Sequence, residues 1–80
     1  MMSQRHILRN HIRNLADLYK ALNAELEMVN YQLEYCHKVG KVEPLKRLES
    51  KSKRIKKELV KVSLKLNDAK WEWVALNKAS

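Results

Sequence analysis

Residues 39–44 read Val39-Gly40-Lys41-Val42-Glu43-Pro44 and contain the only glycine and the only proline of an 80-residue chain. Glycine is favoured just past the end of a helix, because it enters the left-handed region without a steric clash of a Cβ atom. Proline is favoured at the start of a helix, where its missing N–H would have no partner. The order, glycine and then proline, predicts that one helix ends here and another begins. A single long helix kinked at Pro44 is the alternative.

The two sides of this break predict one helix over about 3–39 and another over about 44–79, joined by a turn at 40–43. Ser3 is a candidate N-cap, because its hydroxyl can accept from the free amides of the first turn. A connection this short places neighbouring helices antiparallel. The predicted fold is therefore all-α: an antiparallel, coiled-coil-like hairpin of two helices that forms one domain over residues 1–80.

Both predicted helices carry apolar residues at alternating steps of three and four, which is the repeat of a coiled-coil seam. The a and d positions of the first helix are Leu8, Ile12, Leu15, Tyr19, Leu22, Leu26, Val29, Leu33 and Cys36. Those of the second helix are Leu45, Leu48, Ser52, Ile55, Leu59, Val62, Leu66, Ala69, Trp73 and Leu76. We expect the two seams to pack together, with Cys36 as a small core residue and Ser52 as the one polar member.

Each helix also carries a second apolar stripe on its outer side. The stripe of the first helix consists of Ala21, Ala24, Met28, Tyr31 and Tyr35, and that of the second consists of Val60, Leu64, Trp71 and Val74. A two-helix hairpin has a seam but little interior, so a monomer of this size is marginally stable. We therefore predict a homodimer, a four-helix bundle in which each stripe meets the other stripe of the second copy. The alternative is scattered surface apolar residues, which are common.

Positive charge is concentrated in the second predicted helix. The chain has a net charge of +8, and residues 44–79 hold eleven basic and four acidic residues. Such a surface attracts nucleic acid, an anionic membrane or an acidic protein. Lysine lacks the planar fork with which arginine reads guanine, so binding to phosphates should depend on salt and little on sequence. The candidate nucleic-acid-binding residues are Lys46, Arg47, Lys53, Arg54, Lys56, Lys57 and Lys61; the alternative is a merely solvated helix face.

No motif for catalysis, a cofactor or a metal is present. A chain with one glycine has no phosphate-binding loop or nucleophile elbow, and the three histidines are not at metal-ligand spacing. The single cysteine forms no intramolecular disulfide. The first residues lack an apolar leader segment, and no run reaches the length of a membrane span. We expect a protein that is not an enzyme, has no cofactor and is cytoplasmic or intravirion.

The sequence thus favours a small accessory or regulatory protein, of the kind that phages and plasmids encode, which binds DNA or RNA as a homodimer. The alternative is a protein–protein interaction module, such as an inhibitor, an adaptor or an assembly component, that docks through a second apolar stripe. Trp71 and Tyr31 would then be hot spots, because large aromatic residues dominate interface energies.

Overall fold

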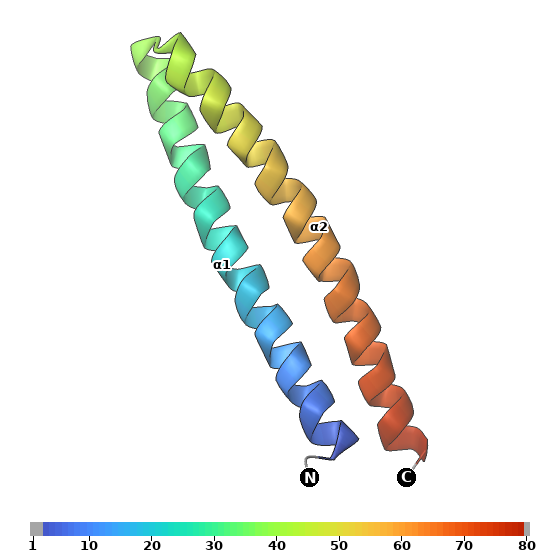
Figure 1. Cartoon of the computed structure of the whole chain (residues 1–80). Coiled ribbons are helices and arrows are strands. Elements are labelled where there is room, and N and C mark those ends of the chain that lie inside the picture. The colour runs from blue at the N-terminus through green and yellow to red at the C-terminus, as the bar shows by residue number, and fades with distance from the viewer. Residues whose placement is uncertain (1–2, 80) are drawn as a thin grey trace.

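Two long helices form the whole structure, a computed structural model that describes residues 3–79. Helix α1 spans Gln4–Val39 and α2 spans Val42–Ala79, and the two run side by side in opposite directions (Figure 1). The molecule measures 60 × 18 × 15 Å, and the ends of the described chain lie together at the pole opposite the turn. The predicted all-α hairpin is confirmed; residues 1, 2 and 80 of the predicted domain lie outside the described residues.

The turn is built on Gly40, which has φ 72° and ψ 27° and so lies in the left-handed region that favours glycine. The Lys41 backbone N–H donates to the Cys36 carbonyl at 3.1 Å, and this bond satisfies one of the carbonyls left free at the end of α1. Helix α2 begins at Val42, two residues before the predicted start at Pro44. The difference of two residues arises because none of the first N–H groups of a helix has a partner within the helix, so proline fits anywhere in the first turn.

The start of α1 is capped as predicted. Ser3 has an extended backbone, and its Oγ accepts a hydrogen bond from the His6 backbone N–H at 3.2 Å. At the opposite end, His37 and Lys38 occupy the last turn, where a positively charged side chain is attracted by the free carbonyl groups of the helix. These local signals explain why α1 begins and ends where it does.

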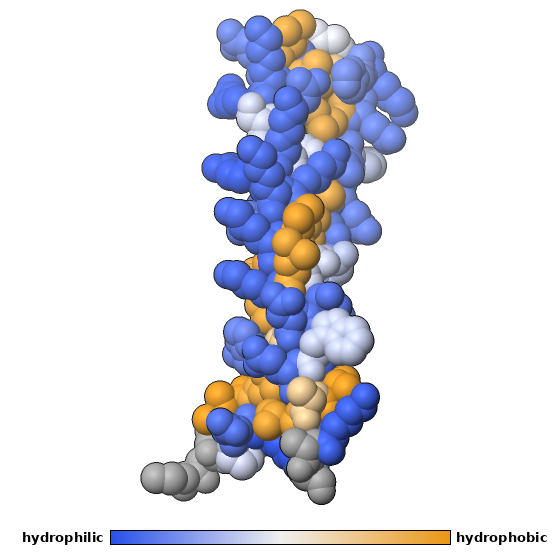
Figure 2. Space-filling view, turned by 90° about the vertical axis from the view of Figure 1, so that its right-hand side faces the viewer, coloured by the Kyte–Doolittle hydropathy of each residue, from blue (hydrophilic) through white to orange (hydrophobic). Residues whose placement is uncertain are grey.

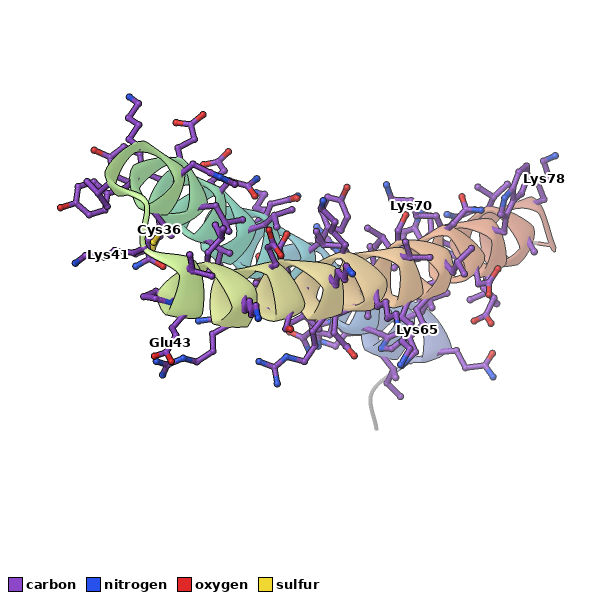
Figure 3. All side chains as sticks on the ribbon, turned by 90° about the horizontal axis from the view of Figure 1, so that it is seen from above. Cys36, Lys41, Glu43, Lys65, Lys70 and Lys78 are labelled. Atoms are coloured by element: carbon purple, nitrogen blue, oxygen red, sulfur yellow. The ribbon has the colours of Figure 1, made fainter. Side chains whose placement is uncertain are left out.

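The predicted seams lie between the helices, and every one of their members is buried or half-buried. Leu8 and Leu15 of α1 form a core cluster with Val62 and Ala69 of α2, in the half of the hairpin near the termini. Nearer the turn, Val29 is only 2% exposed and Ser52 only 6%. Cys36 is also buried, with its sulfur between the helices beside the turn (Figure 3). The prediction that Cys36 and Ser52 are core residues is therefore confirmed.

Candidate nucleic-acid interface

The candidate basic cluster lies on the half of α2 that follows the turn. Its seven members fall within residues 46–61, about 24 Å of helix at 1.5 Å per residue, and all seven side chains are exposed. Among the described residues, Lys61 is the only member in an ion pair, at 3.7 Å from Glu58. The other six positive charges therefore remain available to an external anion.

The described residues form two ion pairs. Glu58 and Lys61 lie one turn apart on α2, at 3.7 Å. Lys51 reaches across the hairpin to Glu25 of α1 at 3.5 Å. About half of each of these two side chains is exposed, so the contact contributes less than about 1 kcal/mol. The ion pair identifies one of the two broad faces of the hairpin.

The hairpin has two broad faces, because g positions of antiparallel helices adjoin on one side of the seam and e positions on the other. Glu25 and Lys51 both occupy g positions, so we name their side the ion-pair face. Arg9, Ile12, Lys70 and Trp73 line a groove on the other side, which we name the Trp73 face. Figure 3 shows Lys65, at a g position, and Lys70, at an e position, leaving α2 on opposite sides.

These faces divide the basic cluster into two groups. Arg47, Arg54 and Lys61 occupy c positions, on the side of α2 next to the ion-pair face. The remaining members, Lys46, Lys53, Lys56 and Lys57, occupy b, e and f positions, which lie along the outer edge of α2 and toward the Trp73 face. The sequence placed all seven in one site, whereas the hairpin presents a lysine-only edge beside a smaller arginine-rich side.

The apolar stripe predicted on α1 is exposed throughout the described structure. Met28 is 67% exposed, Tyr31 76% and Tyr35 56%, and Ala21 and Ala24 are exposed as well. The stripe is also longer than predicted, because three further apolar residues with exposed side chains continue it toward both ends of α1: Ile7, Leu18 and Val39. These three were missed because polar residues separate them in the sequence. Ile7 shares the c position of Met28 and Tyr35, whereas Leu18 and Val39 occupy the adjacent g position.

The apolar stripe predicted on α2 is exposed too, with Val60, Leu64 and Trp71 each at least 60% exposed. Viewed from the α2 side, Figure 2 shows an orange ridge between blue polar surfaces near the middle of the molecule and a broader orange belt near the termini. Val60 and Leu64 line a shallow groove with Tyr19 of α1. Trp73, by contrast, is half-buried against the core, as the seam pattern predicts.

The two stripes lie on opposite sides of the hairpin, which does not favour the dimer arrangement predicted from the sequence. The α1 stripe occupies c, f and g positions and faces outward and toward the ion-pair face. The α2 stripe occupies b and f positions and faces outward and toward the Trp73 face. An isologous contact uses one patch of each copy, so both stripes would have to lie on a single face. One two-fold axis therefore cannot pair each stripe with the other.

A groove lies at the open end of the ion-pair face, near the described termini. It has a volume of about 520 Å³ and lies between Ile7 and His11 of α1 and Glu72 and Ala75 of α2, with Leu8 and Leu76 at its floor. Its lining is mainly apolar, with polar groups at the rim. The groove continues the exposed α1 stripe onto the seam.

Neither the search for metal sites and membrane spans in the described residues nor the comparison with known proteins indicates a function. The described residues contain no group of three His, Cys, Asp or Glu side chains placed to hold a metal ion. Neither helix, over the described residues, combines the length and apolar character needed to cross a bilayer. Comparison with protein families, with curated proteins and with solved structures finds no match. The charged and apolar surfaces of the hairpin are therefore the features that indicate its function.

Proposed function

We propose that this protein is a non-enzymatic accessory protein that binds DNA or RNA through the basic cluster of α2, mainly by contacts to phosphates. The observation that carries this proposal is the set of six exposed cations without an ion pair on about 24 Å of one helix. Lys46, Lys53 and Lys57 are spaced by seven and four residues, so they follow one edge of α2. A row of point charges along a rigid helix suits a phosphate backbone better than it suits the edges of bases.

We also propose that the working form is a homodimer. The hairpin exposes long apolar stripes on both helices, and a two-helix unit buries a small core. A second copy would cover part of that surface and double the number of cations that one complex presents.

Salt titration tests the binding proposal directly. Fluorescence anisotropy with a labelled DNA duplex and with an RNA duplex of the same length would report the affinity at several salt concentrations. If about four phosphates are neutralised, the slope of log K against log salt is about −3.6, and affinity falls about 150-fold between 50 and 200 mM salt. Absence of binding at the lowest salt, or binding that does not weaken with salt, would reject the proposal.

A charge-matched pair of variants separates the cluster from net charge. Replacing Lys53, Arg54, Lys56 and Lys57 with glutamine should weaken binding to all sequences alike and flatten the salt dependence. The control replaces four cations elsewhere on the chain, Lys41, Lys65, Lys70 and Lys78, which are spread along the hairpin (Figure 3). The control has the same net charge and should retain most of the slope. Equal losses in both variants would show that general charge, not the cluster, causes binding.

A second candidate function is docking to another protein, and the α2 stripe favours it. Trp71 is 67% exposed and Leu64 62%, and exposed tryptophans are enriched among interface hot spots. Under this alternative, Trp71→Ala would abolish binding to the protein partner and leave salt-dependent binding to nucleic acid unchanged. Loss of nucleic-acid binding in Trp71→Ala would instead assign the ring to the first function.

A further inference from the structure

The c and g positions of α1 form a second heptad row, in which six of the ten residues are apolar. The c and g positions of α1 are separated by alternating steps of four and three over residues 7–39, about 48 Å of helix. The ends of this row are apolar, with Ile7 55% and Val39 49% exposed, and so is its middle, with Leu18 47% and Met28 67% exposed. A heptad row of this length normally packs against another helix.

We propose that this second seam of α1 is the site at which a second copy of the chain binds, with the two α1 helices antiparallel. The two-fold axis passes between Ala21 and Glu25, the two members at the centre of the seam. This inference deepens the homodimer proposed above by naming its face and register. It does not depend on the binding of nucleic acid.

When a second α1 is placed antiparallel about that centre, apolar members of the seam in one copy lie opposite apolar members in the other. Ile7 comes to lie opposite Val39 of the second copy, and Leu18 opposite Met28. Aliphatic side chains of similar size therefore meet in both layers, and the two-fold axis repeats each pair. A random partner helix would have no reason to match this order in the reverse direction.

The polar members match in the same way. Asn14 lies opposite Gln32 of the second copy, so two side-chain amides can exchange hydrogen bonds. His11 lies opposite Tyr35, which places two rings together. Near the axis, Ala21 lies opposite Glu25 of the second copy, so a small side chain leaves room for the carboxylate that pairs with Lys51 of its own chain.

The charges that α2 presents on the same face are also complementary to a reversed copy. The axis that pairs the α1 helices places the two α2 helices next to each other and antiparallel. On this face the residues near the turn are basic (Arg47, Lys51 and Arg54) and those near the termini are acidic (Asp68 and Glu72), with Glu58, Lys61 and Lys65 between the two groups. Reversal sets the basic end of one α2 against the acidic end of the other, which favours this partner over a parallel copy.

The groove at the open end fits the part of α1 that the register brings to it. Ile7 and His11 line that groove, and their counterparts in the second copy are Val39 and Tyr35. The 520 Å³ hollow is apolar inside, with Glu72 and His11 at the rim, so it can take a tyrosine ring while its hydroxyl stays at the polar edge. The symmetry fills both grooves of the dimer in the same way.

The surface area of the hairpin is large enough for this interface. The chain exposes 6678 Å², whereas a compact monomer of 9.5 kDa exposes about 5,000 Å². The excess of about 1,600 Å² exceeds the roughly 800 Å² that each partner buries in a standard stable interface.

Sedimentation equilibrium without nucleic acid tests the interface. We expect the wild type at micromolar concentration to have about 19 kDa, twice the 9.5 kDa of one chain. Met28→Lys should weaken association at least 100-fold, and its helix content should stay unchanged because Met28 is exposed in the single hairpin. Leu64→Lys is the matched control, since Leu64 is similarly exposed on the other side. A monomeric wild type, or equal disruption by Leu64→Lys, would overturn the proposal.

Cross-linking tests the register independently of stability. In a Cys36→Ala background, Ala24→Cys places one thiol of each copy beside the two-fold axis, and a short bifunctional maleimide should link them into a covalent dimer. Asn30→Cys is the control, because Asn30 is exposed at an e position toward the Trp73 face. Cross-linking of Asn30→Cys, or none of Ala24→Cys, would refute this register. Binding to nucleic acid is measured separately, so failure of either proposal can be told from failure of the other.

Discussion

Replacement of Val29 by alanine should destabilise the hairpin far more than the same replacement at Val60. Val29 is 2% exposed in the seam, whereas Val60 is 60% exposed on the outer side of α2. Removing two buried carbon groups forfeits about 1.6 kcal/mol at roughly 0.8 kcal/mol each. The cavity left behind adds about 1 kcal/mol if the surroundings relax little. Alanine also gains a few tenths of a kcal/mol over valine as a helix former, but this gain is common to both sites.

The difference between the two variants should therefore be about 2.5 kcal/mol, a large part of the 4–12 kcal/mol expected for 80 residues at about 0.05–0.15 kcal/mol each. Urea titration followed by far-ultraviolet circular dichroism measures both free energies of unfolding. Protein concentration must be equal throughout, because association shifts apparent stability. A difference below about 0.5 kcal/mol, within the usual range for surface substitutions, would refute the placement of Val29 at the centre of the seam.

Three further changes probe the turn, the ion pair and the thiol. Gly40→Ala should cost about 1 kcal/mol in a urea titration, because φ is +72° while an added Cβ meets no atom within 4 Å. A double-mutant cycle on Lys51 and Glu25 should give a coupling below about 1 kcal/mol that shrinks with salt, since both side chains are nearly half exposed. Cys36 should react slowly with a thiol reagent in the folded protein and rapidly in urea, because it is buried; equal rates would place it outside the core.

The sequence predicts the packing of this hairpin well because one strong periodic signal specifies it. A strict alternation of three and four, from Leu8 to Cys36 and from Leu45 to Leu76, marks on each helix the face that is apolar along its whole length, and these faces pack together. The turn is less well predicted, because Pro44 is compatible with several positions in the first turn and so does not define the start of α2.

The relation between the outer stripes could not be predicted from each helix taken separately. The sequence pattern of one helix gives the position of Trp71 or Met28 around that helix relative to its seam. It does not give the face of the two-helix hairpin on which the side chain lies. That side follows from the antiparallel packing of the two helices, which sets g beside g and e beside e. Once this is known, the stripe of α1 belongs to the ion-pair face and that of α2 does not.

Dimerisation through the ion-pair face would also lengthen the basic surface. In that arrangement the two α2 helices lie side by side and antiparallel along one edge. The basic cluster at residues 46–61 of one copy is then followed, beyond Lys61, by the basic cluster of the other copy. Two clusters of about 24 Å then form one basic edge of about 45 Å. The lysine-only group points away from the interface, so dimer formation leaves it accessible.

A monomeric variant should therefore bind nucleic acid with a weaker dependence on salt. Met28→Lys retains every member of the basic cluster and adds a positive charge, so net charge alone predicts a steeper slope of log K against log salt. Loss of the second cluster predicts the opposite, about half the slope of the wild type, because the slope scales with the number of neutralised phosphates. Anisotropy titrations of both proteins on one duplex would distinguish the two. A slope as steep as that of the wild type would show that the clusters act separately and that the dimer has no part in binding.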